Sequence, residues 1–334
     1  MNLDRRQLLK LAGLFAAAMA ASRASAMDAP PRSSSDSSNP ESGDFNVHAL
    51  AGSSNFKAIY GDPRLKAEFL KFLTNVFHVL PEERLQRLIE ESANSRRTDR
   101  EIYALVQSRL PEIKPFLGEF RYALPALSRQ KDEMVAQTLD LLGVGHPIDG
   151  YLEIGTTGRY AGRLRAKIEI KGDLVLLNNQ APGYSPTDLV ERGSLGKLGR
   201  FVQMNDYAPV AASEVHDRSL DLIANYIGFH HAPLPKLEPF VASLHRTLRP
   251  GGRMIVRDHD VNSSAMNRMV ALAHDVFNMG LGTAWQVNRA ELRHFTSVDG
   301  LVAYLEARGF KDDGRRLFQQ GDPTKNALMV FRRI

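Results

Sequence analysis

Hydrophobic positions in the first half of the chain recur at helical spacing. Residues 65–80 place apolar side chains three and four positions apart, which is typical of an amphipathic helix. Further on, Thr98 and Glu101 form a capping-box pattern ahead of another apolar stripe. We therefore predict an all-helical segment over residues 56–146. This segment either packs as a subdomain against the next domain or covers a ligand as a lid.

The pattern changes after this segment, where short apolar runs begin to alternate with helical stripes. Such alternation is typical of a parallel sheet with covering helices. We predict one α/β domain over residues 147–334, built on a seven-stranded, mostly parallel sheet. Its last two strands are expected near residues 315–318 and 326–331.

The amino-terminal residues 1–26 have the pattern of a secretory signal. Arg5 and Arg6 precede an apolar stretch over 11–21, and Ala-Ser-Ala at 24–26 offers a cleavage site. The paired arginines resemble a twin-arginine signal, which is read by a receptor as an address. The apolar stretch is shorter than the roughly 20 residues that span a membrane, so we expect no stable membrane span in the mature chain.

The expected partner of this signal is the twin-arginine translocase, and the expected location is outside the cytoplasm, in the periplasm. The alternative is an uncleaved signal that anchors the chain at the inner membrane. Residues 27–55 are rich in Ser, Pro, Asn and Asp, and this composition predicts a disordered linker.

Composition and charge narrow the chemistry. The chain has 334 residues and no cysteine, which excludes disulfides, zinc-thiolate sites and thiol catalysis. Its formal net charge is +5, but residues 1–26 hold four basic and one acidic side chain, so only +2 remains after their removal. A nearly neutral chain gives little electrostatic attraction for phosphate backbones, and we expect no nucleic-acid partner.

A glycine-containing turn follows the first predicted strand. Glu153 stands at the end of the apolar run, and Gly155 and Gly158 follow before a helical stripe. In such a turn, backbone N–H groups can approach a ligand closely, and the next helix presents its positive end.

Two further motifs occur downstream in matching order. The run 219–231 has the pattern of a fourth strand and its loop, and Pro250-Gly251-Gly252 forms a turn before a fifth strand. With the glycine turn, this combination resembles class I S-adenosylmethionine-dependent methyltransferases over about residues 148–334. The resemblance implies a Rossmann-like sheet that finishes in an antiparallel pair, and S-adenosyl-L-methionine as cofactor.

The resemblance also assigns cofactor contacts, at the ends of the first four strands: Glu153, Gly155, Thr157, Gly158, Asn178, Asp206 and Asn225. Two of these positions depart from the family pattern. Thr157 stands where the family usually has glycine. Where an acidic residue usually meets the ribose hydroxyls, this chain has Asn178 and Asn179, and either amide can bond a hydroxyl. Asp206 lies near the position that hydrogen-bonds the adenine amino group in family members. The alternative is that Asp206 is a turn residue that caps the end of the strand.

Candidate catalytic residues follow the fifth strand. His259 can act as a general base toward an acceptor, and Asp258 and Asp260 can orient it. The alternative is a polar strand end whose side chains cap the next helix. One short run does not supply enough ligands for a metal, so we expect none. His230 and His231 also lie at a strand end, either in a substrate pocket or in an ordinary loop.

These observations predict an enzyme that transfers methyl from S-adenosyl-L-methionine to a small or medium-sized acceptor. The altered loop at Thr157 and the missing second-strand acid leave open a degenerate, non-catalytic ligand-binding module of the same fold. An NAD-dependent oxidoreductase is a weaker alternative, because the Pro-Gly-Gly turn and the fourth-strand loop are not typical of one.

Overall fold

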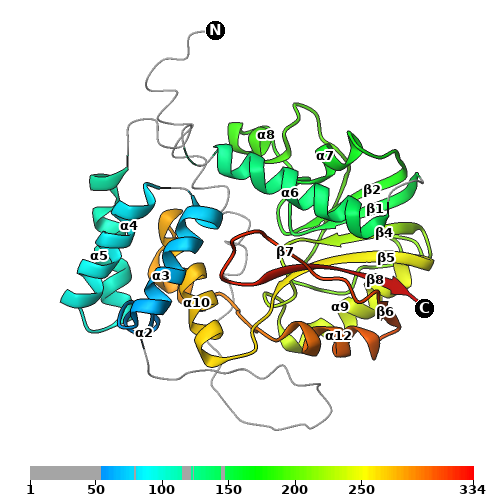
Figure 1. The fold of residues 1–334 in the computed structure, drawn as a ribbon. Coiled ribbons are helices and arrows are strands. Elements are labelled where there is room, and N and C mark those ends of the chain that lie inside the picture. Colours follow the sequence, from blue (N-terminus) through cyan, green and yellow to red (C-terminus); the bar gives the residue numbers. More distant parts are fainter. Residues whose placement is uncertain (1–53, 79, 115–121, 123, 144–146) are drawn as a thin grey trace.

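The computed structural model describes residues 54–78, 80–114, 122, 124–143 and 147–334. The predicted signal peptide and nearly all of the predicted linker lie outside these residues. Within the described part, no helix is both long enough and apolar enough to cross a membrane. Figure 1 shows a group of helices standing beside a sheet that carries helices on both faces.

The first helices form the unit beside the sheet: α2 (Asn55–Tyr60), α3 (Pro63–Phe72), α4 (Glu82–Ser95) and α5 (Asp99–Ile113). The predicted helix over 65–80 is present only in part, because α3 passes into a π-helical turn, η2 (Leu73–Phe77), that ends at left-handed His78. The capping box at Thr98 and Glu101 is confirmed at the start of α5.

A later helix, α10 (Ser264–Gly280), completes the core of this unit. Met269, Leu272 and Val276 of α10 pack in one buried cluster with apolar side chains of α2 to α5. The helical unit is therefore built from two stretches that lie far apart in the sequence.

The sheet has eight strands: β1 (Ile148–Ile154), β2 (Ile170–Asn178), β3 (Arg200–Gln203), β4 (Leu220–Asn225), β5 (Leu248–His259), β6 (Phe310–Asp312), β7 (Leu317–Phe318) and β8 (Asn326–Arg333). Their order is β3-β2-β1-β4-β5-β8-β6, with β7 paired to β8. The first five strands are parallel, and β8 is antiparallel to its neighbours. The predicted α/β fold is confirmed, with the short β6 as one strand more than predicted.

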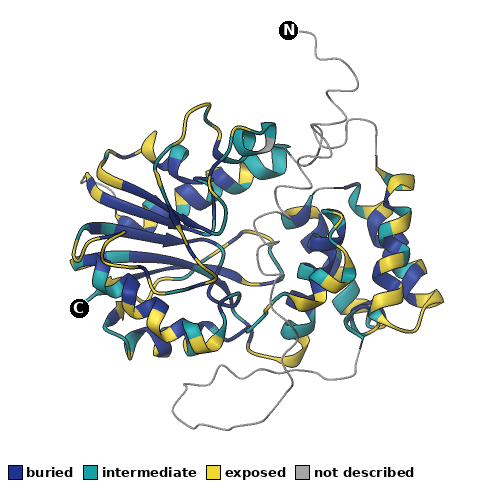
Figure 2. Ribbon diagram, turned by 180° about the vertical axis from the view of Figure 1, so that it is seen from behind, coloured by how far each residue is buried: buried dark blue, intermediate teal, exposed yellow. Residues whose placement is uncertain are grey.

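Helices cover both faces of the sheet, and the strands between them are buried (Figure 2). One face packs against α9 (Leu234–Thr247) and α12 (Val298–Glu306), and the other against α6 (Leu124–Leu142) and α7 (Ala161–Arg165). Helix α6 was predicted as part of the helical segment, but its side chains Met134 and Val135 share a core with β1 and β2. Two short helices, α8 (Pro186–Arg192) and α11 (Trp285–Ala290), lie in connecting segments.

The strand order places a topological switch point between β1 and β4. The chain proceeds from β1 to β2 and β3 on one side, and from β4 to β5 on the other. In open parallel sheets, ligands bind outside the carboxyl ends of the strands at such a point. By this rule, a site is expected at the carboxyl ends of β1, β4 and β5.

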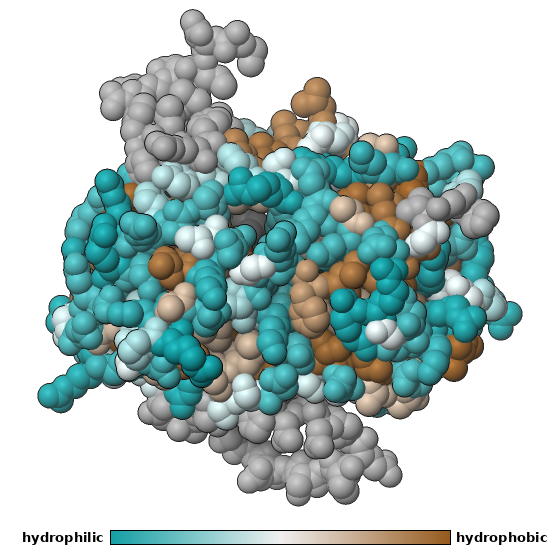
Figure 3. All heavy atoms as spheres, in the orientation of Figure 1, coloured by the Kyte–Doolittle hydropathy of each residue, from teal (hydrophilic) through white to brown (hydrophobic). Residues whose placement is uncertain are grey.

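On the face of the molecule in Figure 3, hydrophilic residues predominate and hydrophobic ones form smaller groups between them.

Candidate functional site

The loop after β1 has the backbone that its glycines predict. Gly155 and Gly158 adopt φ values of 75° and 95°, in the left-handed region that favours glycine. The amide of Gly155 donates to the carbonyl of Leu177, and that of Gly158 donates to the Thr156 hydroxyl. Several of the loop's donors are thus used within the protein, and the helix α7 that follows has only five residues.

Glu153 is buried beneath this loop and holds it in place. Its carboxylate accepts hydrogen bonds from the Tyr151 hydroxyl at 2.9 Å, from the Tyr160 amide at 3.2 Å, and from the Thr156 hydroxyl. Burial raises the pKa of Glu153, and these donors partly offset the rise. A contact between Glu153 and a cofactor remains a prediction, since the carboxylate is occupied by the protein's own groups.

Gly155 also allows close packing across the switch point. A Cβ atom at this position would lie 2.1 Å from Cδ1 of Ile227. We therefore expect Gly155→Ala to lower the free energy of unfolding by about 2 kcal/mol, from the left-handed φ and the overlap together. Denaturant unfolding measures this value.

Gly251→Ala is the matched control, since Gly251 has φ of 76° and no atom near its missing Cβ. The control is expected to lose about 1 kcal/mol from backbone strain alone. Equal losses for the two variants would contradict the proposed overlap with Ile227.

Two buried polar atoms at the switch point have no hydrogen-bond partner among the described residues. They are Oγ1 of Thr157, in the loop after β1, and Nδ2 of Asn225, at the end of β4. Asn225 is fully buried and pairs in register with Ile154. A buried polar group without a partner costs free energy, so these two atoms fit a ligand that supplies hydrogen bonds.

Strand register places Glu153 and Asn225, which were both predicted to contact the cofactor, on opposite faces of the sheet. Ile154 belongs to the core beneath α9 and α12, and Asn225 projects to the same face because the two residues are paired. Successive side chains of β1 alternate between the two faces of the sheet. The carboxylate of Glu153 therefore lies on the face opposite to Ile154, together with Tyr151. The two side chains can therefore meet one ligand only at the rim of the sheet.

The other predicted cofactor contacts lie at the neighbouring strand ends. Asn178 is buried at the end of β2, and its Nδ2 donates to the Gln180 carbonyl at 3.2 Å. Asp206 is half exposed and pairs with Lys236 at 2.9 Å. Its backbone amide donates to Asn179, which links the loops after β2 and β3. Both residues lie at the edge predicted for the cofactor, and their roles remain predictions.

Asp258 positions His230, which corrects the expectation that it orients His259. One carboxylate oxygen lies 2.6 Å from Nδ1 of His230, and the other accepts from the Phe229 amide at 2.8 Å. Toward His259, Asp258 bonds only the backbone amide, at 2.9 Å. The pKa of Asp258 is lowered despite burial, because His230 and these donors favour the charged form.

His259 lies beside this pair with different partners. Its Nδ1 is 3.0 Å from the Thr324 carbonyl, and burial lowers its pKa to about 4. The ring is therefore neutral near pH 7 but a weak base. Asp260 points elsewhere, since its carboxylate accepts from the Val298 amide at the start of α12. The expected cap of the next helix is not made by Asp260, because Asp260 bonds the start of α12 and Ser263 caps α10.

Among the described residues, the rings of four histidines lie close together at this edge: His230, His231, His259 and His274. The ring centroids of His230 and His231 are 4.1 Å apart, and His274 of α10 lies 5.3 Å from His230 and 5.4 Å from His231. Sequence reasoning missed His274 because its helix was identified only by its apolar stripe. A polar side chain within that stripe was the available signal.

The solved structures that resemble this chain are distant from it in sequence. No protein-family model matches the sequence, and no curated protein sequence matches it. Among solved structures, the chain is similar to a 1,6-didemethyltoxoflavin N1-methyltransferase from Burkholderia thailandensis with bound S-adenosylhomocysteine. The identity is 18%, the TM-score is 0.41, and 62% of this chain and 78% of that chain are covered.

Two other solved structures match over more of the chain. An O-methyltransferase family 2 protein from Planctomyces limnophilus, in complex with apigenin, has 13% identity and a TM-score of 0.45, covering 84% of this chain and 88% of that chain. A possible exported protein from Bordetella parapertussis has 14% identity and a TM-score of 0.44, covering 84% and 95%. All three likenesses are distant.

Proposed function

We propose that the protein transfers a methyl group from S-adenosyl-L-methionine to a small-molecule acceptor. The observation that carries this proposal is the buried amide of Asn225, whose Nδ2 has no partner among the described residues at the β1–β4 switch point. The neighbouring Thr157 hydroxyl supports it for the same reason. Both atoms suit a polar ligand lying across the ends of the two strands.

In this proposal, Asn225 and Thr157 hold the cofactor by hydrogen bonds. When bound, the cofactor supplies a methyl group already activated on a sulfonium. The work left to the protein is to align the acceptor with that methyl and to exclude water. His230 and His259 follow β4 and β5 at the same edge of the sheet as Asn225, and Asp258 fixes the orientation of His230.

Calorimetric titration with S-adenosylmethionine and S-adenosylhomocysteine tests the proposal. We expect both to bind, and Asn225→Leu to weaken binding by about tenfold, since it removes the amide but keeps the volume. Asn262→Leu is the control, because Asn262 is exposed in the loop between β5 and α10. Folded protein that binds neither compound would overturn the proposal.

A non-catalytic ligand-binding module is the second candidate. The internal bonding of Glu153 favours it, because this carboxylate already accepts from Tyr151, Thr156 and Tyr160. In that case a different small molecule would occupy the switch point. Native mass spectrometry of protein purified without added ligand separates the two candidates, since it gives the mass of any molecule that is retained.

We also propose that the protein is exported through the twin-arginine route. The support is the sequence pattern of Arg5, Arg6 and the Ala-Ser-Ala run at 24–26. Cell fractionation and amino-terminal sequencing of the mature chain test it. A mature chain that begins after Ala26 and accumulates in the periplasm is expected, and replacement of both arginines by lysine should retain the precursor in the cytoplasm.

A further inference from the structure

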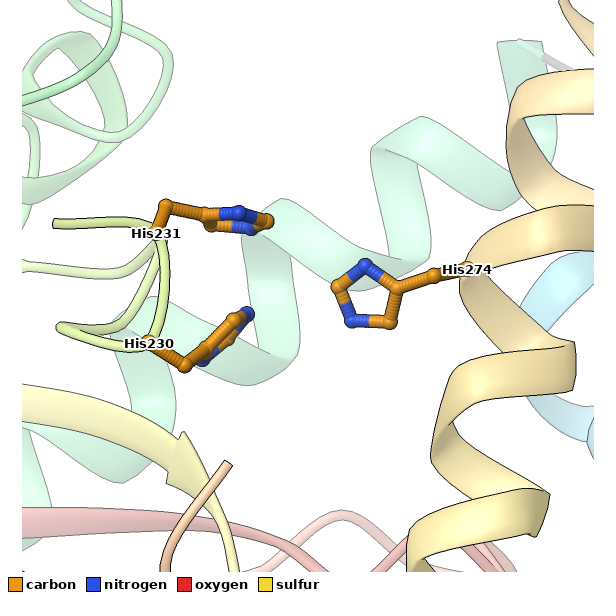
Figure 4. A group of neighbouring side chains, drawn as sticks. All are labelled: His230, His231 and His274. Carbon is orange, nitrogen blue, oxygen red and sulfur yellow. The ribbon is translucent and has the colours of Figure 1, made fainter. Parts of the chain in front are cut away.

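Three histidines from two separate elements face one another at the edge of the sheet. His230 and His231 come from the loop after β4, and His274 projects toward them from α10 (Figure 4). One ring nitrogen of each lies within 4.8 Å of the others. The arrangement therefore brings the imidazole of His274 to two adjacent histidines that lie more than forty residues earlier in the sequence.

The orientation of His230 is fixed by a carboxylate. Nδ1 of His230 lies 2.6 Å from Asp258, so Nε2 is directed toward the other two rings. That Nε2 is buried and has no hydrogen-bond partner among the described residues. Metal-binding histidines usually have one nitrogen bonded to a carboxylate or carbonyl in this way, which leaves the other nitrogen for the metal.

The orientation of His231 follows the same rule. Its Nδ1 lies 3.1 Å from the backbone carbonyl of Leu292, and the neighbouring Glu291 carboxylate is 3.6 Å from the same nitrogen. A nitrogen that donates to a carbonyl carries its proton there, and Nε2 of the neutral ring is then the atom with a lone pair. His231 thus has its outer nitrogen bonded and its other nitrogen on the side of the cluster.

Apolar packing limits solvent on one side of the cluster. The ring of Phe295 is buried, with its centroid 5.2 Å from His230 and 5.2 Å from His274. Simple ring packing would explain the proximity of these side chains but would leave the buried Nε2 of His230 without a partner, at a cost in free energy. A bound cation removes that cost.

We propose that His230, His231 and His274 bind one divalent transition-metal ion, with Zn²⁺ as the best match. Imidazole nitrogen suits zinc and its first-row neighbours, whereas Mg²⁺ and Ca²⁺ take oxygen ligands. Three protein ligands leave a fourth position for water or substrate, as in catalytic zinc sites. Zinc–nitrogen bonds of about 2.0–2.1 Å require the rings to approach one another slightly, through small side-chain rotations.

The proposed metal site is independent of the proposed methyl transfer, because binding of the metal ion requires no methyl donor. The sequence-based expectation of no metal considered only the run at 258–260, whereas these ligands come from a loop and a distant helix. The ion would join α10, and with it the helical unit, to the β4 loop. Binding should therefore raise the melting temperature as well as giving a direct binding signal.

The test is metal titration of mature protein that has been stripped with a chelator, in the absence of any methyl donor. Competition with a chromophoric chelator gives the Zn²⁺ affinity and stoichiometry, and the visible spectrum of bound Co²⁺ gives the coordination. We expect one ion per chain, a four-coordinate Co²⁺ spectrum, and affinity at least a hundredfold lower in His274→Ala and His231→Ala. Asp258→Asn should weaken binding by about 10- to 100-fold.

The matched control is His216→Ala, because His216 is exposed and precedes β4, whereas His230 and His231 follow the opposite end of that strand. It should bind Zn²⁺ like the unchanged protein. His274→Gln, which keeps more of the volume, guards against a folding defect, and circular dichroism verifies each variant. Zn²⁺ affinity that is equal in the His274 variants and the unchanged protein would overturn the proposal. So would binding that His216→Ala reduces as strongly. Zn²⁺ binding without S-adenosylhomocysteine binding would uphold the metal site while refuting the methyltransferase proposal.

Discussion

Arg293→Ala is expected to lower the free energy of unfolding by about 3 to 5 kcal/mol, because it removes one partner of a buried ion network. The guanidinium donates to Asp275 at 2.7 Å, to Asn288 at 2.7 Å and to Glu291 at 3.1 Å. Burial raises the pKa of the Asp275 carboxyl even with this partner present. Without Arg293, the buried Asp275 and the partly buried Glu291 would lose the guanidinium charge that both of them pair with.

The control for this prediction is Arg315→Ala. Arg315 also pairs with an aspartate, Asp140, at 2.9 Å, but both side chains are largely exposed. An exposed pair contributes at most about 1 kcal/mol. Chemical denaturation compares the two variants, and Arg293→Lys should fall between Arg293→Ala and the unchanged protein because it keeps the charge without the forked geometry. Similar losses in the two alanine variants would refute the argument from burial.

Asp258→Ala is expected to cost about 3 kcal/mol or more, since its carboxylate accepts three hydrogen bonds in a buried position. The donors are the amides of Phe229 and His259 and Nδ1 of His230, at 2.6 to 2.9 Å. Each donor left buried without a partner costs about 1 to 3 kcal/mol, although a vacated space that admits water reduces the sum. Thermal and denaturant unfolding measure the loss.

Asp260→Ala is the neighbouring control. Asp260 is only partly buried and accepts from the Val298 amide, so its loss should resemble that of a helix cap, about 1 kcal/mol. A result in which Asp260→Ala costs as much as Asp258→Ala would show that the buried acceptor role of Asp258 has been overestimated. Asp258→Asn should recover part of the stability, because the amide keeps one acceptor oxygen.

Local patterns in the sequence predicted the strands and helices, but not that α6 packs on the sheet or that α10 completes the helical unit. The apolar runs of β1, β2, β4 and β5 and their turn residues specify strands by short-range chemistry, and the capping box at Thr98 is formed within four residues. The short β6 was missed because three residues carry too little periodicity to stand out. The π-helical turn before His78 was missed for a related reason, since its composition matches that of a continuing helix.

The partners at the site depend on tertiary structure and could not be obtained this way. Asp258 meets His230 because β5 lies beside β4 in the sheet, a neighbour relation that no local pattern encodes. The internal bonding of Glu153 likewise depends on how the loop after β1 folds back over the strand. His274 reaches the same edge only through the packing of α10 against the helical unit.

Helix α10 has two sets of contacts, and this couples two parts of the molecule thermodynamically. Its apolar residues complete the core of the helical unit, while His274 faces the loop after β4. Rotation of that unit away from the sheet would carry His274 with it and separate the three imidazoles. Any molecule that binds only when the rings are together must therefore make such rotation less favourable, by an amount that grows with its concentration. Conversely, substitutions in α2 or α5 that weaken the packing of these helices against α10 would also weaken binding at the sheet edge, although none of the three histidines would be changed.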